Sequence, residues 1–411
     1  MSASPINLAA PAGRSDWRLI LLLGALAACG PISIDMYLPS LPAITQAFTV
    51  SASAAQVTLT SFMIGFSVGM LLYGPLSDAY GRRPVLLGGV ILYVIASLAC
   101  ALAFSIGELV AVRFIQALGA GAASVLARAI VRDTHPPHQA AKVLSLLAIV
   151  TSCGPLLAPL IGGQLLLLGS WRFVFAVLTT YGLVCCVAIV YRVRETWPPE
   201  KRAKSALRSS FKVYRHMLLD PVAWGHTLCG GMAFAGMFAY ITATPFVYIN
   251  YFRVAPQHYG FLFGLNILGI MGGNFLNTRL VHKIGTLRMI SGAATIGMLA
   301  SLAVGLVCLT GWGGLAGVVA TLFLVVSVVG VLSADCTTDL MHRYPNNAGA
   351  AAALFGATQF ALGAASSLAV GALQDTGGSP RAMGLVIVFC GLASYAARTV
   401  VVRLHAWPVR A

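Results

Sequence analysis

Twelve apolar stretches of about 20 residues, separated by short polar segments, follow one another along this chain. A helix of about 20 residues crosses the hydrocarbon core of a bilayer and satisfies its own backbone hydrogen bonds there. Transmembrane barrels show alternating segments of about 10 residues instead. The sequence therefore predicts an all-α membrane protein with twelve transmembrane helices. The expected spans are residues 17–40, 55–76, 84–104, 108–130, 142–168, 171–193, 221–247, 258–280, 288–309, 313–334, 347–371 and 382–404.

The placement of the positive charges predicts how these helices are oriented. Only 9% of the 411 residues are charged, yet the formal net charge is +15. With a cytoplasmic N-terminus, Arg172, Arg253 and Arg381 fall on the outer side, Arg113 falls inside a span, and the other Lys and Arg residues fall on the inner side. Cytoplasmic loops carry such an excess. We expect a multi-pass protein of the bacterial inner (plasma) membrane with both termini cytoplasmic, and no nucleic-acid partner.

The longest hydrophilic stretch, RVRETWPPEKRAKSALRSSFKVYRH at 192–216, divides the spans into six plus six. This predicts an N-terminal six-helix bundle at 1–193, a basic cytoplasmic linker at 194–220 and a C-terminal six-helix bundle at 221–411. A basic segment interrupted by prolines is expected to form an amphipathic helix on the inner leaflet. The two bundles are expected to be pseudo-symmetric, since GPLSDAYGRR after the second span is echoed by RLVHKIGTLR after the eighth.

The acidic residues bear on how such a protein could be driven. Neither a nucleotide-binding motif nor a metal-ligand spacing occurs, so we expect no enzyme, no metal and no cofactor, with a proton gradient as the energy source. Of 11 Asp and Glu residues, only Asp35 falls clearly inside an expected span. A charge there costs roughly 2.5–3.5 kcal/mol. Asp35 is therefore the candidate proton carrier, and Glu108, at the outer end of the fourth span, is the second choice.

Arg113 in the fourth span is the other charge inside the membrane. A buried arginine requires a carboxylate or backbone carbonyls, and we hypothesise that Asp35 lies beside it and that the two couple protons. The alternative is an arginine whose long stem reaches the outer interface.

The turn between the second and third spans, GPLSDAYGRR at 74–83, combines residue types that suit a tight, closely packed loop. Gly74 would allow another helix to approach closely, Asp78 could pair with an arginine, and Gly81 would permit the turn. Arg82 and Arg83 would keep the loop cytoplasmic. The alternative is an ordinary positively charged loop, for which the two arginines alone would suffice.

The fifth span contains CGPLLAPLIGGQL at 153–165, in which prolines predict bends and glycines predict close helix packing. The alternative is a merely kinked helix. The residues of interest are Gly154, Ala158, Pro159, Gly162 and Gly163.

These motifs resemble those of a known group of transporters. GPLSDAYGRR resembles the major facilitator loop signature (G-x-L-x-D-x-x-G-R-R/K), RFIQALGA at 113–120 the fourth-span signature (R-x-x-Q-G-x-G-A), and the fifth span the antiporter signature (G-x-x-x-G-P-x-x-G-G). Ala117 and Ala158 stand in place of a family glycine. With SIDMYLPSLP at 33–42, the pattern is similar to the Bcr/CflA family of twelve-span drug:proton antiporters.

The resemblance implies a role for each motif. Gly74, Asp78, Gly81, Arg82 and Arg83 would form a gating loop that locks the cytoplasmic faces of the two halves together in the outward-open state. Arg113 would take part in proton coupling. The fifth-span signature would indicate an exporter.

A small-molecule substrate is expected near the midplane, between the two bundles. The candidate ligands are polar, aromatic or Met residues inside spans, and each could instead face lipid or another helix. They are Tyr37, Gln116, Phe234, Met237, Phe238, Asn266, Phe355 and Gln359.

The predicted function is proton-driven efflux of small organic compounds such as antibiotics, by a monomer in the lipid bilayer. The alternatives are a major facilitator exporter or proton-coupled importer of a specific metabolite, and a non-transporting receptor or scaffold.

Overall fold

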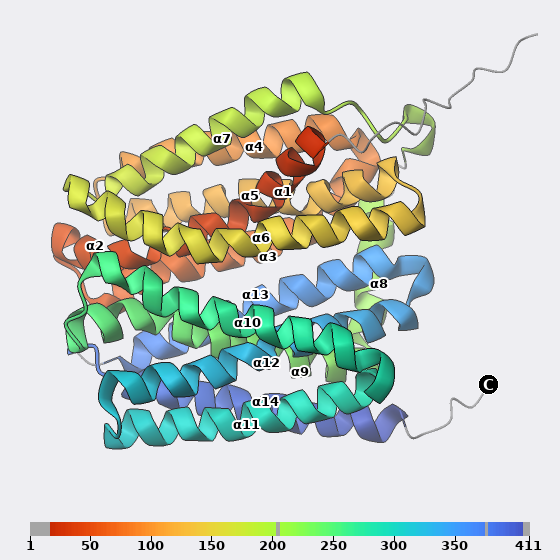
Figure 1. The fold of residues 1–411 in the computed structure, drawn as a ribbon. Helices are drawn as coiled ribbons and strands as arrows, with labels where there is room; N and C mark the ends of the chain where they lie inside the picture. Colours follow the sequence, from red (N-terminus) through yellow and green to blue (C-terminus); the bar gives the residue numbers. More distant parts are fainter. Residues whose placement is uncertain (1–16, 203–205, 375–376, 406–411) are drawn as a thin grey trace, which may run out of the picture.

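The computed structural model describes residues 17–202, 206–374 and 377–405. Over these ranges the chain is helical, without strands, and Figure 1 shows the helices in two groups, α1–α7 and α9–α14. Twelve helical segments are long and apolar enough to cross a membrane, which confirms the all-α, twelve-span prediction.

The first group contains the six spans before the linker. Its helices are α1 (Trp17–Asp35), α2 (Leu41–Phe48), α3 (Ala52–Tyr80), α4 (Arg82–Ala101), α5 (Ile106–Thr134), α6 (Pro137–Leu165) and α7 (Arg172–Arg192), with the 3₁₀ turn η1 (Leu38–Ser40) joining α1 to α2. The first span therefore continues to Phe48 rather than ending at residue 40. Pro39 and Pro42 occupy first-turn positions of η1 and α2, where a missing N–H costs nothing.

The second group contains the six spans after the linker. Its helices are α9 (Pro221–Thr244), α10 (Pro256–Ile284), α11 (Thr286–Thr310), α12 (Gly314–Arg343), α13 (Ala348–Leu373) and α14 (Arg381–His405), and the π-helix η4 (Pro245–Tyr251) extends α9. The tenth span was predicted to end at residue 334, but α12 runs on to Arg343. Its last nine residues include polar side chains that lie inside the bundle.

The linker folds onto one end of the molecule. Its helix α8 (Ala206–Leu218) runs crosswise to the long helices in Figure 1, at the end where α1 begins and α14 ends. We call this the linker end and the opposite end the far end. Tyr214 and Met217 of α8 are buried, and the Tyr214 hydroxyl donates to the carbonyl of Leu71 on α3 at 3.3 Å. Because α8 also packs against α9 and α13, it contacts both groups of helices.

The two groups meet along α3 and α13 and along α6 and α10. Thr60 on α3 donates to Ser367 on α13 at 2.9 Å, and Ser67 donates to the carbonyl of Ala357 at 2.7 Å. At the far end, η1 and α2 also contact η4. The far end of the seam between the groups is therefore closed by backbone and side-chain contacts.

Candidate functional site

Arg113, on α5, is completely buried. Its Nη1 donates to the backbone carbonyl of Ser33 at 3.2 Å and to Oε1 of Gln116 at 2.8 Å. Gln116 is held in turn by a hydrogen bond from its Nε2 to Ser97 at 2.8 Å. Nε and Nη2 of Arg113 have no hydrogen-bond partner among the described residues. The full burial rules out an arginine that reaches the outer interface.

Aromatic rings stabilise the Arg113 charge in place of a carboxylate. The guanidinium carbon lies 4.3 Å from the ring centre of Phe62, 4.5 Å from that of Tyr37 and 5.8 Å from that of Phe175. Cation–π contacts of this kind contribute about 2 kcal/mol when desolvated. The Tyr37 hydroxyl shares a 2.7 Å hydrogen bond with Thr58, which fixes the ring. Tyr37 therefore cages Arg113, although the sequence suggested it as a substrate ligand.

Asp35 lies at the end of α1 and is 5% exposed. The expected pair with Arg113 does not form, because no ion pair or hydrogen bond of Asp35 is present within the described ranges. The reason is helical phase. Ser33 and Tyr37, four residues apart, lie on the face of the first span that meets Arg113, whereas Asp35, between them, points to the opposite side.

Asp35 is directed toward the second bundle. Its carboxyl group lies near the side chains of Tyr240 on α9 and Tyr259 on α10. The next residue, Met36, has its carbonyl against α6 at the position of Gly162. Asp35 thus lies at the seam between the two bundles, toward the far end, and none of the described cations forms an ion pair with it.

The α6 motif packs at the same seam. A methyl group at Gly162 would clash with the carbonyl oxygen of Met36, and one at Gly163 would lie 2.7 Å from the carbonyl oxygen of Pro256 on α10. A methyl group at Gly154 would lie 3.1 Å from Ile32 on α1, and Ala158 is buried. Pro159 lies within the continuous helix α6. The predicted close packing is present, and it joins α6 to both bundles.

Five phenylalanines form a cluster across the seam. Phe66 of α3 lies beside Phe62, 6.2 Å between ring centres, and meets Phe360 of α13 at 4.7 Å. Phe360 in turn contacts Phe234 at 5.2 Å and Phe238 at 5.8 Å, both on α9. Two of the predicted substrate residues, Phe234 and Phe238, therefore lie where the bundles meet. The cluster connects them to the cage around Arg113 through Phe62.

The other predicted substrate residues fall in different places. Met237 is partly buried against the main core, and Asn266 is fully buried with its Nδ2 donating to Tyr240 at 3.0 Å. Gln359 donates to Ser333 at 2.7 Å. Phe355 is buried beneath Gly230, inside the second bundle. The ring of Phe355 therefore packs against α9.

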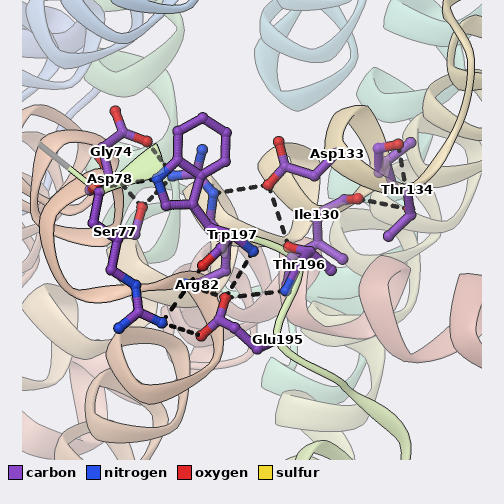
Figure 2. Close-up of polar contacts among 12 residues, drawn as sticks. Gly74, Ser77, Asp78, Arg82, Ile130, Asp133, Thr134, Glu195, Thr196 and Trp197 are labelled. Carbon is purple, nitrogen blue, oxygen red and sulfur yellow. Dashed lines mark hydrogen bonds and ion pairs between the residues drawn. The ribbon is translucent and has the colours of Figure 1, made fainter. Parts of the chain in front are cut away.

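A second polar site surrounds Arg82 at the linker end (Figure 2). The Arg82 guanidinium pairs with Asp78 of α3 at 2.6 Å and with Asp133 of α5 at 2.9 Å. Its Nη1 also donates to Ser77. The pairing of Asp78 with an arginine is therefore present, and Asp133 is a partner that the sequence analysis did not single out. One cation thus holds three helices of the first bundle together.

The linker completes this site. The carboxylate of Glu195 accepts the backbone N–H of Arg82 at 2.9 Å, and the Trp197 ring centre lies 4.8 Å from the Arg82 guanidinium carbon. The Trp197 indole donates to the carbonyl of Asp78 at 3.1 Å. Burial and the charge of Asp78 raise the pKa of Tyr214 on α8 to about 12. In the sequence, the segment RETWPP is recognisable only as polar, so the contacts of Glu195 and Trp197 could not be predicted from it.

Three further residues of the turn, Gly81, Arg83 and Gly74, were predicted to belong to the gating loop. Gly81 has φ +102°, which a side chain would strain, so the predicted tight turn is present. Arg83 donates to the carbonyl of Val190 on α7 at 3.0 Å. At Gly74, a Cβ would meet nothing within 4 Å. The expected close approach of another helix at Gly74 is therefore not present in this conformation.

A buried acid was also missed. Asp335 on α12 is 4% exposed, and its Oδ1 accepts a 2.8 Å hydrogen bond from Nδ2 of Asn277 on α10. The predicted span ended one residue before it, so Asp335 counted as a helix-end residue. Asp35 is therefore not the only acid inside the helices.

The profile of the Major Facilitator Superfamily matches residues 23–368. The chain belongs to the major facilitator superfamily. A Bacillus subtilis (strain 168) protein, the uncharacterized MFS-type transporter YdgK, is 39% identical over 371 residues, covering 89% of this chain and 91% of that one. The bicyclomycin resistance protein homolog of Haemophilus influenzae is 32% identical, covering 93% of this chain and 96% of that one.

A chloramphenicol resistance protein of Pseudomonas aeruginosa is 33% identical, covering 68% of this chain and 66% of that one. Among solved structures, the partially occluded inward-open xylose transporter XylE from E. coli aligns with a TM-score of 0.71 at 18% identity, covering 94% of this chain and 97% of XylE. The resemblance to Bcr/CflA transporters is confirmed, and the protein is a multi-pass membrane transporter rather than an enzyme.

Proposed function

We propose that this transporter exports small organic compounds such as antibiotics in exchange for protons, across the bacterial inner membrane and with both termini cytoplasmic. The observation that carries the proposal is Asp35, a buried carboxyl without an ion pair among the described residues, at the seam of the two bundles. An isolated buried carboxylate is costly, whereas a protonated one is tolerated. A proton on Asp35 is therefore the simplest account of the closed far end.

The coupling of proton entry to substrate export follows from the needs of Asp35 once it has lost its proton. An ionised Asp35 requires a donor, which a substrate entering from the cytoplasmic side can provide. Opening of the far end then admits a proton, which neutralises Asp35 and releases the substrate outward. Arg113, held by Ser33, Gln116 and its aromatic cage, keeps two nitrogens, Nε and Nη2, free of hydrogen bonds within the described part, and it biases the charge on Asp35 through the shared first span.

Several observations support an organic, drug-like substrate. The seam carries the cluster of Phe66, Phe234, Phe238 and Phe360, and Met237 lies on the same helix as two of them. Aromatic and Met surfaces adapt to varied apolar compounds. Relatives are named as bicyclomycin, chloramphenicol and multidrug resistance proteins. One chain supplies both bundles, so a monomer is sufficient.

The test is drug resistance in a host whose own pumps are deleted. Expression should raise the inhibitory concentration of at least one compound in an antibiotic panel, and a protonophore should abolish the gain. In inverted vesicles, Asp35→Asn should lower proton-driven export at least about tenfold, a loss of about 1.4 kcal/mol of coupling. Glu108→Gln, which changes an acid at the start of α5, is the matched control and should keep export.

Full proton-driven export by Asp35→Asn would show that Asp35 is not the proton carrier. Sensitisation of the host instead of resistance would indicate a proton-coupled importer, and export of one metabolite without any drug would indicate a metabolite exporter.

A further inference from the structure

Asp335 and Asn277 form a polar pair inside the second bundle, far from Asp35. They lie on α12 and α10, are 4% and 6% exposed, and share one hydrogen bond, from Asn277 Nδ2 to Asp335 Oδ1 at 2.8 Å. α12 continues for eight residues beyond Asp335, about 12 Å toward the linker end. The pair therefore lies within the bundle on the linker side.

Each residue of the pair has one further oxygen, and both of these oxygens are unsatisfied. Oδ2 of Asp335 and Oδ1 of Asn277 are buried and have no hydrogen-bond partner among the described residues. An unsatisfied buried polar atom costs about 1–3 kcal/mol, and more when it is charged. Both oxygens are acceptors, so rotating the amide cannot satisfy them together: the site lacks one donor.

One proton supplies that donor. If Asp335 carries a proton on Oδ2, this O–H can donate to Oδ1 of Asn277 while the existing N–H···O bond is kept. The carboxylic acid and the amide then share two hydrogen bonds, and both unsatisfied oxygens gain a partner. The proton comes from water and returns to water, and no other bond is made or broken.

The surroundings favour a neutral Asp335 and give it a path to water. Asp339 lies one helical turn nearer the linker end on α12, and its carboxylate lies 3.4 Å from Nε2 of the buried His226 on α9. Asp339 also lines a hollow between α10 and α11. Ionising Asp335 would place two carboxylates on one face of α12, which is unfavourable. On the helices packed around this part of α12, the other titratable groups are Cys229 of α9, Arg279, His282 and Lys283 of α10, and Arg288 of α11, and α12 itself carries Cys336, His342 and Arg343.

We propose that Asp335 is a second proton site of this transporter. In this conformation its protonated carboxyl group donates to Asn277, and the proton exchanges with water at the linker end by way of Asp339. The site belongs to the other bundle and the other end of the molecule from Asp35. Only its consequence for transport, one more proton moved per substrate, rests on the proposed function.

Infrared spectroscopy of the purified protein tests the proton directly. At neutral pH the wild type should show a carbonyl stretch of a protonated carboxyl group, and Asp335→Asn should lose the intensity of one such group. The loss should be the same in an Asp35→Asn background. The Asp335→Asn variant should fold, because the introduced amide can donate its own N–H to Asn277 and keep both hydrogen bonds. Equal spectra of wild type and Asp335→Asn would overturn the proposal.

Two further measurements separate a proton from a bound cation and from a structural role. In an Asp35→Asn background, the melting temperature should fall from neutral to alkaline pH by more when Asp335 is present than when it is replaced by Asn. Neither melting temperature should depend on replacing Na⁺ or K⁺ by choline. A Na⁺ or K⁺ dependence that Asp335→Asn removes would mean that the two oxygens hold a metal ion, which overturns the proposal.

In proteoliposomes, Asp335→Asn should move one proton fewer per substrate than the wild type, and an unchanged ratio would contradict the proposed consequence. Since the infrared test requires no transport, its failure and a failure of drug export are distinguishable.

Discussion

The turns between α3 and α4 and between α10 and α11 occupy corresponding places in the two bundles and share one backbone conformation. Gly81 has φ 102° and ψ 153°, and Gly285 has φ 87° and ψ 147°. In both turns the glycine N–H bonds to the carbonyl four residues earlier, at 2.9 Å and 2.8 Å, and the next helix begins at once. The repeated backbone explains why both motifs keep this glycine.

The side chains around the two turns differ completely. Arg82 follows the first glycine and pairs with Asp78 and Asp133, and a methyl group at Gly81 would lie 2.5 Å from the Glu195 carboxylate. Among the described residues, none of those in the second turn itself, 281–288, forms an ion pair, and a methyl group at Gly285 would meet nothing within 4 Å. The comparison shows that the first turn owes its polar network to Asp78 and Asp133 of its own bundle and to the linker residues Glu195 and Trp197.

The largest expected effect is the loss of Arg82. Removing one partner of a buried ion-pair network leaves carboxylates unbalanced, so Arg82→Ala should lower the free energy of unfolding by about 3 kcal/mol. Arg288→Ala, at the corresponding side of the second turn, should change it by less than about 0.5 kcal/mol. Thermal unfolding in detergent measures both, and equal effects would contradict the asymmetry.

The glycines should show an intermediate effect. An alanine in either backbone conformation is strained by about 1–3 kcal/mol, so Gly81→Ala and Gly285→Ala should both destabilise the protein. Gly81→Ala should cost more, because its methyl group also meets Glu195 and Arg202. Measuring Gly81→Ala in a Glu195→Ala background should bring the two costs closer together. If the two costs stay as far apart in that background, the contact with Glu195 does not explain why Gly81→Ala is the more destabilising.

The smallest effect concerns the ion pair between Asp220 and Arg343 at the linker end. Asp220, which precedes α9, accepts from Arg343 Nε and from the Tyr344 hydroxyl, each at 2.6 Å. Burial raises the pKa of Asp220, but these bonds and that from the Val222 N–H outweigh it, so the pKa lies below its ordinary value of 3.8.

Because the pKa of Asp220 is lowered by folding, its contribution is present above about pH 4 and lost as the pH falls through the folded-state pKa. Arg343 is 40% exposed, so Asp220→Asn should cost only about 1 kcal/mol near neutral pH. The melting temperatures of the two proteins should converge at pH values below the ordinary pKa of an aspartate. A constant difference throughout that range would show that Asp220 acts through something other than its charge.

Much of the fold could be predicted because a bilayer allows few solutions. Twelve apolar segments of sufficient length must be helices, and their number and order were right. Two of the ends were wrong. The first span continues to Phe48 because its prolines occupy first-turn positions of η1 and α2, and the tenth continues to Arg343 because polar residues prolong α12 beyond the loss of hydropathy.

The candidate site was predictable in its residues but not in its pairing. Asp35 and Arg113 were recognised as costly charges, and both are buried. Ser33 and Tyr37 are four residues apart, with Asp35 midway between them. Once it is known that Ser33 and Tyr37 meet α5, this spacing predicts that Asp35 faces away from Arg113. Glu195 and Trp197 had no comparable signal, since their role depends on how the linker folds back.

The sequence by itself determined the class of protein, the number of spans, the turn motifs and the superfamily, because hydropathy and short motifs are local properties. Only the tertiary structure decided that aromatic rings rather than Asp35 surround Arg113, that linker residues contact Arg82, and that Asp335 accepts a hydrogen bond from Asn277. The physical reason is that a buried charge can be stabilised by any nearby group of complementary charge, by a hydrogen-bonding group or, for a cation, by an aromatic ring. Helix phase and packing, which join residues far apart in the chain, determine which partner that is.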